Sequence, residues 1–293
     1  SFPSEVLSAL SASKEDYKIL VVNGFTRLSS PEIVLTNDKQ GFDISTDIGV
    51  PYMQTAEYSG AQIDFNRFKI GVVAPGGLGY SGLELNGKVI AGNNFDYPYI
   101  HAKAMQDKKH HYSISSTSKE ALETGKVNIS DYQLVDILFG LQRDDKKSSI
   151  YKYKTFTPAM QNRISEYLDN GGKVFVSGTY ISRDMQESGE KQFTANDLCY
   201  SSDSCMSTPS SFTIGERNFS IFSDWNPKFY ASKTIEVLKP NGFSEPFITL
   251  PTGECVATAS SNVVAFGFPF ESIQGEEIRT YVMKRVLQEL LQK

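Results

Sequence analysis

The segment from Thr157 to Gly178, TPAMQNRISEYLDNGGKVFVSG, constrains the fold more than any other part of the chain, because it encodes a helix, a turn and a buried strand in succession. Thr157 can cap the helix, and the proline after it suits the first helical turn. Apolar side chains then recur at helical spacing, and two glycines supply the left-handed stop. The strand from Lys173 to Val176 shows no polar alternation, which is typical of a central strand in a parallel sheet.

Buried strands and amphipathic helices alternate along the rest of the chain. We predict strands at Lys18–Gly24, His111–Ser115, Tyr132–Gly140 and Asn262–Gly267, and helices at Ile100–Gln106, Ser118–Thr124 and Glu276–Gln292. Thr117 and Glu120 fit a capping box for the middle helix. Because crossovers between parallel strands are right-handed, this order predicts an α/β fold with a doubly wound, mainly parallel sheet of five core strands in the flavodoxin-like order 2-1-3-4-5.

Two long, irregular stretches interrupt this alternation, at about 25–92 and 183–261. Both are too long to be simple connections, and we interpret them as insertions. A length of 293 residues fits one enlarged domain. We therefore predict a single α/β domain over 1–293, in which 1–17 is a lead-in from a preceding module.

Composition excludes several classes of function. The chain is 40% hydrophobic and 22% charged, and its net charge of -5 argues against a nucleic-acid partner. It contains no apolar run of the roughly 20 residues that a membrane helix needs, so we expect no membrane span.

The three cysteines, Cys199, Cys205 and Cys255, do not have the spacing of a zinc site. A bridge between Cys199 and Cys205, a pairing of Cys255 and three unpaired thiols are the open alternatives. We expect neither a metal nor a cofactor.

The candidate nucleophile is a polar residue directly after the predicted strand Lys173–Val176. Ser177 stands there, although the full G-x-S-x-G elbow is absent. Only three histidines are present, and His101, with Asp96 five residues earlier, is the best-placed base. Ser177, His101 and Asp96 could form a hydrolase triad. In the structural alternative, Ser177 satisfies a buried turn, Asp96 caps a helix and His101 makes a structural hydrogen bond.

Ligands bind beyond the carboxyl ends of strands in folds of this type. Further residues near those ends are candidates for lining a substrate cleft there. They are Asn23, Phe25, Asn94 and Tyr180.

Several blocks of the chain resemble a known domain. They are KILVVNGFTRLSSPE, NFDYPYIHAKA, YQLVDILFG, FTPAMQNRISEYLDNGGKVFVSGTYISRDM and FGFPFESI. Together they resemble a domain of secreted Bacteroidetes proteins labelled xanthan lyase or N-acetylmuramoyl-L-alanine amidase, where it follows fibronectin type III modules. The resemblance spans nearly the whole chain, and the opening SFPSEVLSA resembles the last strand of such a module.

At the level of fold, the domain is similar to class I glutamine amidotransferase-like and ThuA-like domains. The resemblance places Gly178 where an amidotransferase carries its catalytic cysteine, so the thiol is absent. The sequence FGFPFESIQ stands where the His-x-Glu pair of that family would follow the last strand. The resemblance therefore implies the fold without amidotransferase chemistry.

Two functional hypotheses follow from the resemblance and the candidate residues. The first is an exported module, secreted, periplasmic or attached to the cell surface, of a glycan- or peptidoglycan-processing protein. It would act as a hydrolase on polysaccharide or peptidoglycan fragments, beside fibronectin type III and amidase-type modules. The second is a catalytically silent carbohydrate-binding or spacer module with a degenerate amidotransferase-like fold.

Overall fold

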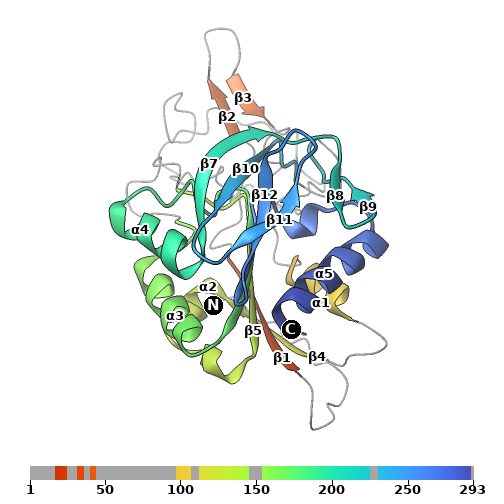
Figure 1. The fold of residues 1–293 in the computed structure, drawn as a ribbon. Coiled ribbons are helices and arrows are strands. Elements are labelled where there is room, and N and C mark those ends of the chain that lie inside the picture. The colour runs from red at the N-terminus through yellow and green to blue at the C-terminus, as the bar shows by residue number, and fades with distance from the viewer. Residues whose placement is uncertain are drawn as a thin grey trace, which may run out of the picture.

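The structure is a computed structural model that describes residues 17–24, 32–35, 40–43, 97–106, 112–144, 154–224 and 230–291. A seven-stranded sheet lies between two helical layers (Figure 1). Asp96, Phe25 and Asn94 lie outside the described residues, as do His110 and His111.

Five neighbouring strands of this sheet run parallel. In spatial order they are β4 (Tyr112–Ser118), β1 (Tyr17–Asn23), β5 (Leu134–Gly140), β6 (Lys173–Gly178) and β13 (Val263–Phe266). Numbered along the chain, these strands have the order 2-1-3-4-5, which confirms the predicted doubly wound fold. Beyond β13 the sheet continues antiparallel through β12 (Cys255–Ala259) and β11 (Glu245–Thr249).

Helices cover both faces of the sheet because every central strand is buried on both sides. On one face lie α1 (Tyr97–Met105) and α5 (Glu276–Leu291), and on the other lie α2 (Lys119–Glu123) and α3 (Pro158–Asp169) (Figure 1). The short α4 (Ser188–Gln192) runs into a π-helical turn at Phe193–Asp197 that contacts α3.

The segment from Thr157 to Gly178 folds as predicted. The hydroxyl of Thr157 accepts a hydrogen bond from the amide of Met160 at 3.4 Å, so this residue caps α3. Gly171 has a φ of 82°, and the amide of Gly172 donates to the carbonyl of Tyr167 at 2.9 Å. The helix thus ends in the left-handed turn that glycine allows, and the chain enters β6 directly.

Two predicted helix starts were wrong. Helix α1 begins at Tyr97 rather than Ile100, because Pro98 occupies its first turn, where a missing N–H costs no intrahelical bond. Helix α2 is capped by Ser118, whose hydroxyl accepts from the amide of Ala121 at 3.3 Å. Thr117 does not cap it, because this residue is buried in β4, where it pairs with Val22 of β1.

The prediction that 183–261 is irregular was also wrong. This stretch contains an antiparallel ladder of β7 (Tyr200–Ser207) with β10 (Thr234–Pro240), a hairpin of β8 (Phe212–Ile214) with β9 (Arg217–Phe219), and strands β11 and β12. The serine-rich β7 is partly exposed, so it lacks the apolar run that marks a buried strand. In the other predicted insertion, the structure describes the antiparallel pair β2 (Glu32–Leu35) and β3 (Gln40–Asp43).

The cysteines form no disulfide. Cys199, Cys205 and Cys255 are all free thiols of intermediate exposure. Burial raises the pKa of each, so none of them is an activated thiolate.

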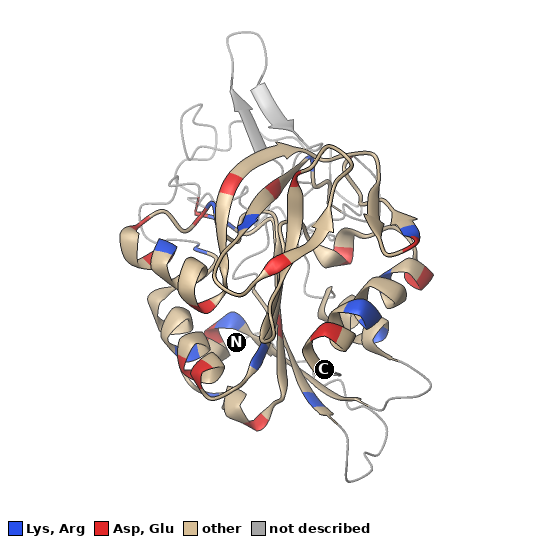
Figure 2. Ribbon diagram, viewed as in Figure 1, with Lys and Arg blue, Asp and Glu red and all other residues tan. Residues whose placement is uncertain are grey.

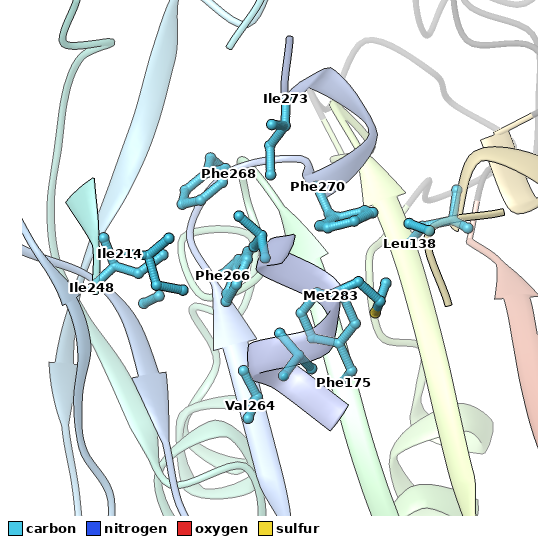
Figure 3. Packing of buried hydrophobic residues seen from close by; sticks show 14 of the residues in the cluster. Leu138, Phe175, Ile214, Ile248, Val264, Phe266, Phe268, Phe270, Ile273 and Met283 are labelled. Atoms are coloured by element: carbon cyan, nitrogen blue, oxygen red, sulfur yellow. The ribbon is translucent and has the colours of Figure 1, made fainter. Parts of the chain in front are cut away.

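The larger core cluster lies between the sheet and the layer of α1 and α5, and phenylalanines dominate its centre (Figure 3). The ring of Phe175 on β6 meets the ring of Phe266 on β13 edge to face, with centroids 5.0 Å apart. It also lies 5.9 Å from the ring of Phe270, in the 3₁₀ turn Phe270–Ser272 that follows β13. This cluster surrounds the polar network described next.

Candidate functional site

A network of four fully buried polar side chains links α1 to the sheet. His101 on α1 bonds through Nδ1 to Oδ2 of Asp136 on β5 at 2.7 Å, and through Nε2 to Oε2 of Glu271 at 3.3 Å. The hydroxyl of Tyr230 donates to Oε1 of Glu271 at 2.6 Å. The ring of Phe270 lies edge-on to the imidazole, with centroids 4.7 Å apart. His101 is therefore held on both sides by carboxylates inside an aromatic core.

Strand alternation explains the position of Asp136. Successive side chains of β5 point to opposite faces of the sheet, and Leu134 and Leu138 belong to the cluster under α1 and α5. Asp136 lies between them in the sequence and so faces the same helical layer. This places its carboxylate beneath His101.

The geometry favours the protonated state of His101. Both of its nitrogens face carboxyl oxygens, and the ring can donate to both only when it is protonated, because a neutral imidazole has one donor nitrogen. Burial lowers the pKa of His101, but the charges and hydrogen bonds of Asp136 and Glu271 outweigh it and raise the pKa to about 9. Burial also raises the pKa of Asp136, although the imidazolium opposes that shift. We take the imidazolium as the form at neutral pH, because two acceptors flank it.

This pairing makes stability depend on pH. The folded-state pKa of His101, about 9, lies above its unfolded value of 6.5. The stabilisation is therefore complete below pH 6.5 and is lost as the pH rises through 9. The shift corresponds to a contribution of about 3 kcal/mol. We expect a histidine ring resonance, assigned by its absence from His101→Gln, to titrate near pH 9 in an NMR series. Titration near the ordinary value would contradict the imidazolium assignment.

Ser177 lies close to this network along the sheet. It ends β6 with its side chain fully buried, and it pairs in register with Leu138 of β5, two residues after Asp136. Its Oγ and the Oδ1 of Asp136 have no hydrogen-bond partner among the described residues. His101 is bonded to the two carboxylates and not to Ser177, so the described part of the structure does not show a serine–histidine hydrogen bond. The proposed role of Asp96 stays a prediction.

The remaining predicted residues sit near the carboxyl ends of the strands. Asn23 ends β1 and is 6% exposed, in register with Leu138 of β5. Tyr180 follows β6 and is half-buried, with the guanidinium carbon of Arg143 4.5 Å from its ring centroid. The structure thus places Asn23, Ser177 and Tyr180 at the same edge of the sheet. Their proposed part in substrate binding remains a prediction.

Sequence reasoning missed three members of the network. Asp136 had a usable signal, because it is the one acid inside the buried run YQLVDILFG. Glu271 had a similar signal, between the aromatic residues and the serine of FGFPFESI. An ionisable residue in such a run needs a partner, since burying an unpaired charge is costly. Tyr230 had no comparable signal.

The chain after β6 is covered by the strands of 200–240. The hydroxyls of Thr179 and Ser232 lie 3.1 Å apart, and the hydroxyl of Tyr200 donates to the carbonyl of Ile181 at 3.3 Å. Glu236 of β10 accepts hydrogen bonds from the backbone amides of Ser182 and Arg183 in this turn. The edge at which a doubly wound fold binds ligands is thus closed at β6 by the chain itself.

A hollow opens at the opposite edge, beside the amino ends of β1 and β6. Its volume is about 870 Å³, and its lining includes Tyr17, Tyr132, Tyr167 and Lys173. Neither His101 nor any of its partners lines this hollow.

Acidic and basic residues are interspersed along the ribbon in Figure 2. Among the described residues, no cluster of three or more His, Cys, Asp or Glu side chains could hold a metal ion. Nor does that part of the chain contain a helix with the length and apolar character needed to cross a membrane.

Comparison with known proteins returned structural similarity alone. No protein-family model matches the chain, and no curated protein matches it. Similar solved structures include a β-galactosidase from the psychrophilic Marinomonas ef1, with 12% identity and a TM-score of 0.42 over 65% of this chain and 24% of that one. This chain thus spans about a quarter of that enzyme's length.

Two other similar structures carry the names suggested by the sequence resemblance. A putative ThuA-like protein from Parabacteroides merdae has 9% identity and a TM-score of 0.39 over 95% of this chain and 91% of that one. A glutamine amidotransferase from Thermotoga maritima has 14% identity and a TM-score of 0.32 over 61% and 74%. The doubly wound fold of this chain rests on the strand order of its sheet.

Proposed function

We propose that this chain is a catalytically silent module of an exported glycan- or peptidoglycan-processing protein. It binds polysaccharide or peptidoglycan fragments, or it spaces the neighbouring modules. The absence of catalysis is inferred from one observation, the pairing of His101 with two carboxylates.

A general base must have a nitrogen free to accept a proton. Both nitrogens of His101 are engaged as donors, and the raised pKa keeps the ring protonated at neutral pH. A protonated ring cannot take the proton of Ser177. The Gly178 that ends β6, in place of a catalytic cysteine, supports the same conclusion.

The biological setting of the proposal rests on the sequence resemblance. We place the protein outside the cytoplasm, either secreted, periplasmic or at the cell surface. Fibronectin type III and amidase-type modules are its proposed neighbours in a longer chain. The xanthan lyase label that accompanies similar domains would then describe those neighbours rather than this module.

A hydrolase is the second candidate, and one observation favours it. The Oγ of Ser177 is buried at the end of β6 and has no hydrogen-bond partner among the described residues. Because this hydroxyl is fully buried, the hydrolase candidate requires that substrate binding expose it to a base. The two candidates differ in turnover, and Ser177→Ala separates them.

We expect the wild-type protein to convert no member of a glycan and muropeptide panel, whether or not it binds them. Replacing the buried, unpartnered hydroxyl of Ser177 by alanine should leave both binding and the melting temperature nearly unchanged, since no hydrogen bond is lost. Binding would be measured by calorimetry and turnover by chromatography of the products. Turnover by the wild type that Ser177→Ala abolishes would reject the silent module in favour of the hydrolase.

A further inference from the structure

The turn after β6 presents two adjacent backbone amides to one carboxylate. The amide of Ser182 donates to Oε2 of Glu236 at 2.9 Å, and the amide of Arg183 donates to Oε1 of the same side chain. Each carboxylate oxygen thus receives its own N–H. Successive backbone amides that converge in this way form an anion-binding concavity.

The carboxylate in this concavity is inaccessible to water. Glu236 lies on β10, a strand outside the central sheet, and its side chain is fully buried. Burial raises the pKa of Glu236, while the amides of Ser182 and Arg183 and the charge of Arg183 act in the opposite direction. Each of its two oxygens accepts a backbone N–H, so we take the ionised carboxylate as the form that the turn holds. The turn therefore supplies all the hydrogen bonds that the described structure gives this side chain.

The backbone of Glu236 is fixed as firmly as its side chain. Its amide donates to the carbonyl of Gly267 at 2.7 Å, just after β13. A Cβ at Gly267 would collide with the carbonyl of Glu236, so only glycine permits this approach. The carboxylate is consequently delivered to the turn by a strand that is itself anchored at the end of the sheet.

We propose that the turn after β6 is a carboxylate-binding site whose resident occupant is Glu236, and that a small external carboxylate such as acetate binds there once this side chain is removed. The site lies at the edge where doubly wound folds bind ligands. Its occupation from within ties the β7–β10 ladder to β6, together with the contact of Thr179 with Ser232. The inference does not depend on the proposed glycan-binding function.

The substitution Glu236→Ala tests the site because it leaves both amides in place and removes the carboxylate with its γ-methylene group. Two buried donors then lack acceptors, which is costly. Acetate supplies one carboxylate and one methyl group to fill the vacancy. At about ten times its dissociation constant, acetate should raise the melting temperature of Glu236→Ala by about 2–4 °C relative to chloride at equal ionic strength, measured at pH 7.

Three controls should show no such rise. The wild type keeps its own carboxylate in the site, and Glu236→Gln keeps a side chain of the same size there. Glu245→Ala removes an exposed carboxylate from β11 and leaves the turn intact. An equal response to acetate in Glu236→Ala and in these three proteins would overturn the proposal.

If Glu236→Ala does not fold in chloride buffer, its refolding yield in acetate replaces the melting temperature as the readout. Recovery of folded protein in acetate or formate, but not in chloride, would support the carboxylate site. Equal yields in all three salts would overturn it. Neither readout involves a glycan, so either result leaves the test of the proposed function independent.

Discussion

Replacing His101 by alanine is expected to lower the free energy of unfolding by about 3–5 kcal/mol at pH 7. The substitution leaves the carboxylates of Asp136 and Glu271 buried without the cation that lies between them. It also leaves a cavity in the aromatic core beside Phe270. Removing one partner of a buried ion pair is among the most destabilising single changes, because the remaining charge stays desolvated.

Urea denaturation of the purified variant would measure this loss. Lys103→Ala is the matched control, because Lys103 lies on the same helix and pairs with Glu276 at 2.8 Å, with exposed side-chain fractions of 42% and 60%. An exposed ion pair contributes at most about 1 kcal/mol. Equal losses in the two variants would show that the buried network does not stabilise the fold. A double-mutant cycle with Asp136→Asn would then isolate the coupling between the two side chains.

Truncating Phe175 to alanine is expected to cost about 3–5 kcal/mol as well, for a different reason. Its side chain is fully buried near the middle of the sheet, under the layer of α1 and α5 (Figure 3). The ring contacts Phe266, Phe270 and His101, at centroid distances of 5.0, 5.9 and 6.3 Å. Alanine would leave these neighbours facing a cavity, and neighbours held by a closely packed sheet relax little.

The control for this variant is Phe243→Ala. Phe243 is 96% exposed in the turn between β10 and β11, so its removal should change stability by no more than about 0.5 kcal/mol. Chemical denaturation of both variants under one set of conditions gives the comparison. A loss below about 1 kcal/mol for Phe175→Ala would mean that the core refills the space of the ring.

The parallel core could be predicted because its signals are local. Thr157, the adjacent proline and the glycine pair mark both ends of α3 through backbone conformation, which depends on the residues themselves. The apolar runs of β1, β5 and β6 are equally explicit. The strand order then follows from the handedness of crossovers.

The strands of 200–240 could not be predicted in the same way. Residues such as Ser202 and Ser204 on β7 carry no apolar pattern, because the strand is stabilised by pairing with β10 and is exposed over much of its length. Strand propensity depends strongly on such context. The closure of the sheet edge at β6 was therefore missed together with the strands that produce it.

The sequence by itself determined the doubly wound sheet and its strand order. Only the tertiary structure decided the state of His101, because its partners Asp136 and Glu271 are 35 and 170 residues away in the chain. It likewise placed Glu236 against amides more than 50 residues earlier. Periodicity specifies which face of an element is buried, whereas the partner of a buried charge depends on which elements pack against that face, and this is set by the assembled core.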